Sequence, residues 1–151
     1  MKNKIVLLII FLFPLFAVNV FTMQHSHSYS TKTDCDINTG PCTKTIEHDS
    51  IQVILDINPK PVSPMKELLF SVILKEGESA VTDARVALDL TMPGMFMGVN
   101  RPVLSRVKDD RYEGKGVIPV CPHGGELWKA EVTVERDGRS ATVSYIFEVN
   151  Q

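Results

Sequence analysis

Residues 127–149 read LWKAEVTVERDGRSATVSYIFEV, and apolar side chains occupy every second position on both sides of a central turn. Asp137 and Gly138 are a residue pair that two-residue hairpin turns prefer. Because successive side chains of a strand point to opposite faces, this pattern predicts an antiparallel hairpin with one buried face and one solvated face. The side chains expected on the buried face are Trp128, Ala130, Val132, Val134, Ala141, Val143, Tyr145, Phe147 and Val149.

Five further strands are predicted upstream of this hairpin, at residues 51–57, 67–75, 86–91, 103–108 and 111–118. Turn-forming residues separate them, and no convincing helical pattern occurs after residue 50. About seven short strands at this spacing are typical of an all-β, immunoglobulin-like antiparallel β-sandwich. An N-terminal hydrophobic helix is expected to precede the sandwich.

The N-terminal sequence pattern predicts both that helix and the export of the chain. Lys2 and Lys4 precede an apolar run over residues 5–21, which is the layout of a secretory signal. A retained anchor needs roughly 17 to 25 apolar residues, so both a cleaved signal and a membrane anchor remain open. We therefore expect a signal peptide or anchor at 1–23, a tether with a cysteine pair at 24–49, and the sandwich domain at 50–151. The expected location is the periplasm or the inner membrane of a bacterial envelope.

Composition argues against two functional classes. The chain has 16 basic and 18 acidic residues and a net charge of −2, which gives no electrostatic reason to bind nucleic acid. It also lacks a phosphate-binding glycine loop, a nucleophile elbow and a zinc-protease helix motif. We therefore expect a protein that is not an enzyme.

Three cysteines follow the leader, in a compartment where disulfides persist. Cys35 and Cys42 flank a run of turn formers, NTGP at 38–41, which favours a local disulfide between them. Cys121 is then the odd cysteine, available as a free thiol, a metal ligand or an intermolecular bridge. The alternative is that Cys121 pairs with one of the other two.

Soft metal ligands gather in two segments. Met92, Met95 and Met97 lie around a Pro-Gly bend, and Cys121 is two residues from His123. Thioether and thiolate sulfurs favour Cu(I) over hard ions, so these five residues are the candidate metal ligands and copper is the candidate ion. A structural reading is also open, because methionines at such a place can simply cap the end of a core.

A second hypothesis needs no metal. Met95, Phe96 and Met97 can form an exposed apolar patch of the kind that marks contact with a protein partner. The chain is then an interaction module of a membrane complex.

Four short runs carry a resemblance to known proteins: TMPGM at 91–95, NRP at 100–102, RYEG at 111–114 and WKAEVTV at 128–134. They resemble the YtkA-like and FixH-like domains over residues 50–149. The resemblance implies an immunoglobulin-like sandwich behind a membrane segment, with Met92, Met95 and Met97 as the soft-ligand loop. FixH-like proteins are associated with copper delivery to, or assembly of, haem-copper respiratory oxidases. A respiratory oxidase or a copper transporter is therefore the implied membrane partner. The cysteine pair and the Cys121-Pro122-His123 run depart from the FixH-like pattern.

Overall fold

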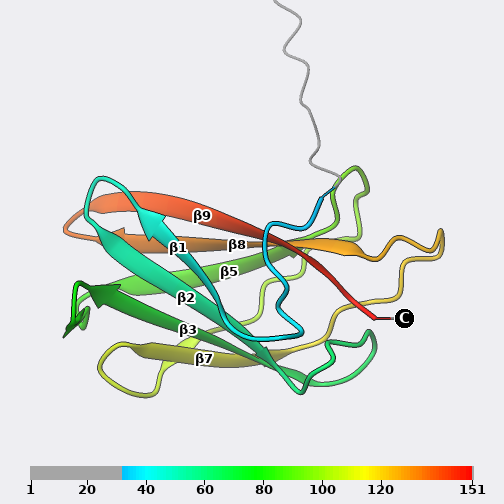
Figure 1. The fold of residues 1–151 in the computed structure, drawn as a ribbon, viewed down its shortest axis with the longest axis horizontal. Helices are drawn as coiled ribbons and strands as arrows, with labels where there is room; N and C mark the ends of the chain where they lie inside the picture. The colour runs from blue at the N-terminus through cyan, green and yellow to red at the C-terminus, as the bar shows by residue number, and fades with distance from the viewer. Residues whose placement is uncertain (1–31, 151) are drawn as a thin grey trace, which may run out of the picture.

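The computed structural model describes residues 32–150, so the expected leader at 1–23 and the first part of the tether lie outside the described residues. The described chain forms nine strands in two sheets and no helix (Figure 1). The strands are β1 Cys42–Ile46, β2 Ile51–Asn58, β3 Leu68–Glu76, β4 Ser79–Ala80, β5 Arg85–Thr91, β6 Ser105–Arg106, β7 Arg111–Gly116, β8 Leu127–Arg136 and β9 Arg139–Glu148. Among residues 32–150, no helix is long and apolar enough to cross a membrane.

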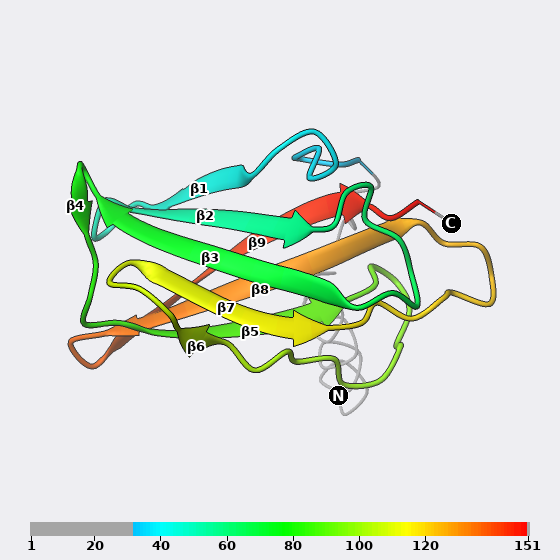
Figure 2. The ribbon, with the colours of Figure 1, turned by 90° about the horizontal axis from the view of Figure 1, so that it is seen from below.

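All strand pairs are antiparallel, and the two sheets pack face to face. The larger sheet has the order β1-β2-β3-β7-β6, with β4 paired to β3, and the smaller sheet has the order β5-β8-β9. Figure 2 shows the larger sheet in front of the smaller one. The prediction of an all-β, immunoglobulin-like sandwich is confirmed, and the two strands beyond the expected seven are β1, of five residues, and β4, of two.

The hairpin of β8 and β9 forms in the predicted register. Its pairs run from Arg136 opposite Arg139 to Leu127 opposite Glu148, around the Asp137-Gly138 turn. The alternating apolar side chains of β8 are buried and face those of β2 and β3 across the core. Trp128 fills the interior, as expected for the inner face of this strand.

The expected strand at 103–108 is reduced to the two residues of β6. Pro102 is buried beside β7 and has no backbone N–H to donate to a neighbouring strand, which interrupts the ladder. The carbonyl of Val103 also occupies the place where a side chain at Gly114 would begin. This close approach holds the segment against β7 without regular pairing.

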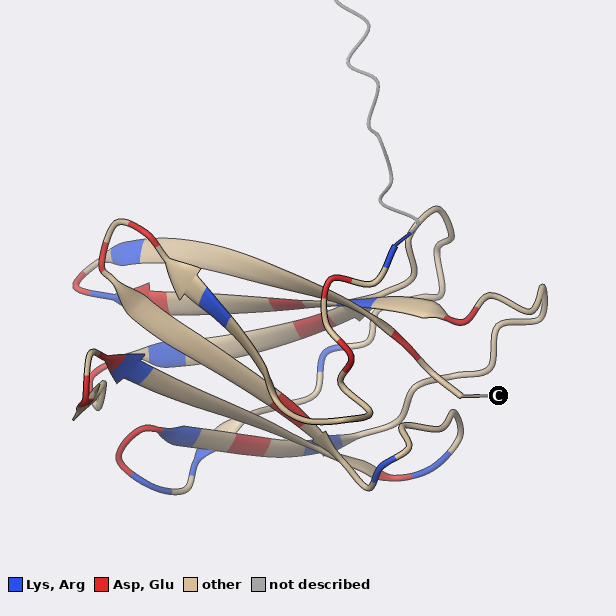
Figure 3. Cartoon of the chain, in the orientation of Figure 1, with Lys and Arg blue, Asp and Glu red and all other residues tan. Residues whose placement is uncertain are grey.

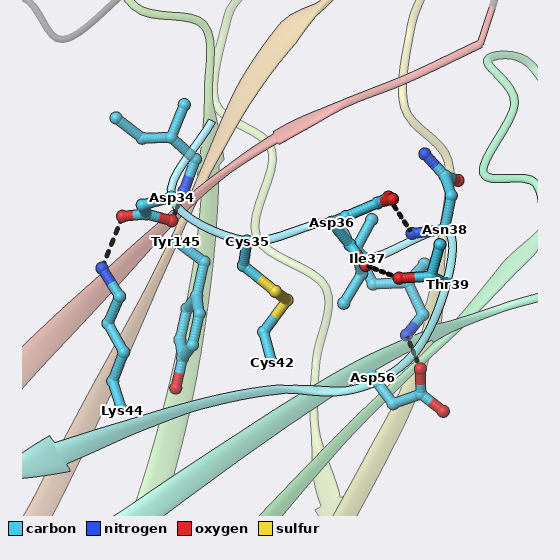
Figure 4. Close-up of a disulfide and its surroundings, with 12 residues drawn as sticks. Asp34, Cys35, Asp36, Ile37, Asn38, Thr39, Cys42, Lys44, Asp56 and Tyr145 are labelled. Carbon is cyan, nitrogen blue, oxygen red and sulfur yellow. Dashed lines mark hydrogen bonds and ion pairs between the residues drawn. A yellow bond between two sulfur atoms is a disulfide. The ribbon is translucent and has the colours of Figure 1, made fainter. Parts of the chain in front are cut away.

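Part of the segment expected to be a tether belongs to the folded domain. β1 lies within residues 24–49 and pairs with β2 along its whole length. Cys42, the first residue of β1, forms a disulfide with Cys35, and their Cα atoms are 5.9 Å apart, within the usual range for such bridges (Figure 4). Ile37, inside the loop that the disulfide closes, is fully buried. The packed domain therefore begins before residue 50.

Two contacts join this N-terminal segment and the larger sheet to β9. The backbone N–H of Asp34 donates to the carbonyl of Ile146 at 3.1 Å, and the carboxylate of Asp34 accepts from the N–H of Ile146 at 2.8 Å. The hydroxyl of Tyr145 donates to the carbonyl of Val53 at 2.7 Å, and its burial raises the pKa of that hydroxyl above the usual range. The two sheets are thus fastened together along the β1 and β9 edges.

Replacement of Ile37 by alanine tests whether the 34–41 segment is part of the core. We expect Ile37→Ala to lower the free energy of unfolding by about 2–5 kcal/mol, because it removes a fully buried side chain and leaves a cavity. Urea unfolding followed by Trp128 fluorescence measures the change. The control Val103→Ala, at an exposed position, should change stability by no more than about 0.5 kcal/mol. Equal, small effects for both variants would contradict a packed 34–41 segment.

Candidate metal site

Two tight turns, each with proline at its second position, build the candidate site. In the first, the N–H of Met95 donates to the carbonyl of Met92 at 3.2 Å across Pro93 and Gly94. Gly94 has a φ of 79°, so Pro93 and Gly94 occupy the two central positions of a type II turn, as their residue types prefer. Met92 and Met95 are paired as an antiparallel bridge, which puts their side chains on the same side of the turn.

The second turn presents a thiol. The N–H of Gly124 donates to the carbonyl of Cys121 at 3.1 Å, with Pro122 and His123 at the corner and Gly124 at a φ of 73°. Cys121 points into the protein and is 3 % exposed, and it is free rather than disulfide-bonded. His123 is exposed at the corner of the turn.

The two turns bring three sulfur atoms together, and we call Met92, Met95 and Cys121 the sulfur cluster. The Cys121 thiol donates a hydrogen bond to Met95 Sδ, with the two sulfurs 3.7 Å apart. A Cβ atom at Gly125 would lie 3.2 Å from Met92 Sδ and 3.4 Å from Cys121 Sγ. A side chain at Gly125 would therefore press against both of these sulfurs. An open hollow of about 300 Å³ follows, lined by Met92, Met95, Cys121, His123, Gly125 and Leu127 among others.

The cluster fits a soft metal ion. A metal–sulfur bond is about 2.3 Å long, so one ion can contact two sulfurs that are 3.7 Å apart. Two thioethers and one thiol are the donor types that select Cu(I). Among residues 32–150, no three His, Cys, Asp or Glu side chains gather into a group that could hold a metal ion, so the methionines are essential to this candidate site.

Four of the five candidate ligands lie together, and the fifth does not. Met92, Met95 and Cys121 form the cluster, and His123 lies at the rim of the same hollow. Met97 is partly buried against the hydrophobic core and does not line the hollow, so it packs as a core residue there. Phe96, between Met95 and Met97, projects into solvent.

Gly125 could not be identified as a site residue from the sequence. Its neighbour Gly124 adopts a left-handed backbone conformation and needs to be glycine, but Gly125 does not have a positive φ. Its importance comes from the two sulfur side chains beside it, Met92 from the other loop and Cys121 four residues earlier in its own. The only sequence signal is the Gly-Gly pair directly after the Cys121 turn.

Comparison with known proteins adds little to this geometry. No protein-family model and no curated protein matches the sequence. Among solved structures, the chain is similar to a DUF4785 family protein from Legionella pneumophila, at 18 % sequence identity and a TM-score of 0.48. The match covers 66 % of this chain and 29 % of that chain, so this chain spans less than a third of the protein it matches. A likeness at this level carries no functional argument.

Thiol counting tests the arrangement of the cysteines. We expect the folded, unreduced protein to react slowly with a thiol reagent such as Ellman's reagent, because Cys121 is buried and hydrogen-bonded to Met95. In denaturant one thiol per chain should react, and after reduction all three. Rapid labelling of Cys35 or Cys42 in the unreduced protein, identified by peptide mass spectrometry, would contradict the pairing.

Proposed function

We propose that this chain is a non-enzymatic domain of the bacterial envelope that binds copper as Cu(I) and passes it to a membrane protein. The observation that carries the proposal is the sulfur contact between Cys121 and Met95, 26 residues apart in the sequence, with the Met92 sulfur and Cys121 both beside Gly125. Sulfur side chains that only fill a core do not need to face a shared open hollow. Here a thiol and two thioethers do so, with an imidazole at the rim.

The charge and burial of the cluster favour a monovalent ion. Met92 is 7 % exposed and Cys121 is 3 % exposed, so a bound ion is largely removed from water on that side. A Cys121 thiolate neutralises one positive charge, and thioethers neutralise none. A divalent ion would keep an uncompensated charge next to the core, which is costly. Cu(I) meets both the charge requirement and the preference for soft donors.

One side of the cluster is open, which suits a carrier. Met95 is half-buried and His123 is exposed, so a donor group from another protein can approach along the hollow. Met92 and Cys121 hold the ion from the inner side. An ion held by few ligands, with room for an incoming one, can be exchanged between proteins without being released to water.

The envelope location is supported by the predicted leader and by the Cys35–Cys42 disulfide, since disulfides persist in oxidising compartments. The resemblance to FixH-like domains favours a haem-copper respiratory oxidase as the membrane partner, and a copper transporter is the other candidate.

A metal-free interaction module is the alternative function. It is favoured by Phe96, which is 87 % exposed beside the cluster.

Native mass spectrometry of protein purified from the envelope under inert gas tests copper binding. We expect one copper per chain, lost in Met92→Leu, Met95→Leu and Cys121→Ser, because each removes a sulfur donor. The methionine-to-leucine changes conserve volume and should cost less than about 1.5 kcal/mol of stability, so loss of copper will not reflect unfolding.

Met97→Leu is the matched control, since Met97 lies in the same loop but does not line the hollow. It should keep the copper. Protein that stays metal-free when Cu(I) is added would contradict the copper proposal and favour the interaction module. Equal copper loss in the Met97 variant would instead mean that the three sulfurs of the cluster are not the site.

A further inference from the structure

The loops next to the sulfur cluster carry the most exposed large hydrophobic side chains of the described chain. We call the loops 92–104 and 117–126 the apolar end. Phe96, Val99 and Val103 project from the first loop with 87 %, 77 % and 82 % of their surface exposed, more than any other large hydrophobic side chain of the described chain. Val117 and Val120 project from the second loop. Such a surface is costly in water unless something covers it.

Charge is scarce in these two loops and plentiful in the turns at the opposite end of the sandwich, while the neighbouring β2–β3 loop carries Lys60, Lys66 and Glu67. Residues 92–100 and 116–125 contain no Asp, Glu, Lys or Arg, and Arg101 is the single charged residue of the 92–104 loop. The turns at the opposite end contain many carboxylates, including Asp49, Glu76, Asp83, Asp109 and Asp137. Figure 3 shows both loops of the apolar end almost entirely tan and the opposite turns rich in red and blue.

The chain that comes from the leader enters the fold at the apolar end. Asp34 is hydrogen-bonded to Ile146, Ile146 is paired with Lys129, and Lys129 is paired with Thr91, the residue before Met92. One row across the smaller sheet therefore joins the start of the described chain to the start of the Met92 loop, as can be followed in Figure 1. Between the apolar run at 5–21 and Lys32 lie residues 22–31, which span no more than about 36 Å even if fully extended.

We propose that the apolar end docks on the surface of the lipid bilayer, with Phe96, Val99 and Val103 inserted at the level of the headgroups. Apolar side chains gain free energy by leaving water at this depth, and an exposed basic side chain beside them attracts anionic lipids. Arg101, whose side chain is 68 % exposed, has this position although it also pairs with Asp89. The carboxylate-rich end then points away from the membrane, and the sulfur cluster is held at the bilayer surface.

Tryptophan fluorescence in vesicles that contain brominated phospholipids tests this orientation. The full chain is used as purified from the envelope, with its leader in whichever form the cell leaves it. Phe96→Trp places a reporter at the apolar end, and Val107→Trp is the matched control, exposed at the opposite end. The native Trp128 is buried in both variants and gives a common baseline.

We expect the emission of Phe96→Trp to shift to shorter wavelength and to be quenched by the brominated lipids, and that of Val107→Trp to stay at the baseline. Adding Val99→Ser and Val103→Ser to Phe96→Trp should reduce the quenching, and more anionic lipid should increase it. Equal quenching of both reporters, or quenching of neither, would overturn the proposal. A Phe96→Trp shift that occurs in native envelope membranes but not in pure lipid would also overturn it, because the apolar end would then bind a membrane protein.

Discussion

The strict alternation of half-buried and buried side chains along β8, from Leu127 to Val134, is the constraint on which the other features depend. β8 is the central strand of the smaller sheet, between β5 and β9. A shift of its register by one residue would move Trp128, Val132 and Val134 from the core into water and bury charged residues in their place. The register is therefore fixed, and with it the row that puts Thr91 beside Lys129 and Ile146.

That register also sets the position of the sulfur cluster. β5 ends at Thr91, so the Met92 turn begins at a defined level of the sheet. β8 begins at Leu127, a few residues after the Cys121 turn, and β8 is the hydrogen-bonded neighbour of β5. The end of one strand and the start of its neighbour lie at the same edge of an antiparallel pair, so the two turns meet there. The sulfur contact between Cys121 and Met95 follows from strand pairing rather than from any local motif.

Most of the fold, and about half of the site, follows from the sequence. The β8–β9 hairpin was predictable because its turn residues and its alternation agree. β1 was not, because Cys42–Ile46 is only five residues long and has apolar side chains only at its two ends. The Met92–Met95 pairing follows from Pro93 and Gly94, whose residue types specify the turn. The inward packing of Met97 and the space over Gly125 depend on side chains from distant segments, which local patterns do not reveal.

The central claim is that Met92, Met95 and Cys121 bind one Cu(I) ion together. X-ray absorption at the copper K-edge of the Cu(I)-loaded protein measures this most directly. We expect a Cu(I) edge and a first coordination shell dominated by sulfur at about 2.3 Å, with a sulfur ligand lost in Met95→Leu. A shell of nitrogen and oxygen atoms, or a sulfur shell unchanged in Met95→Leu, would contradict it.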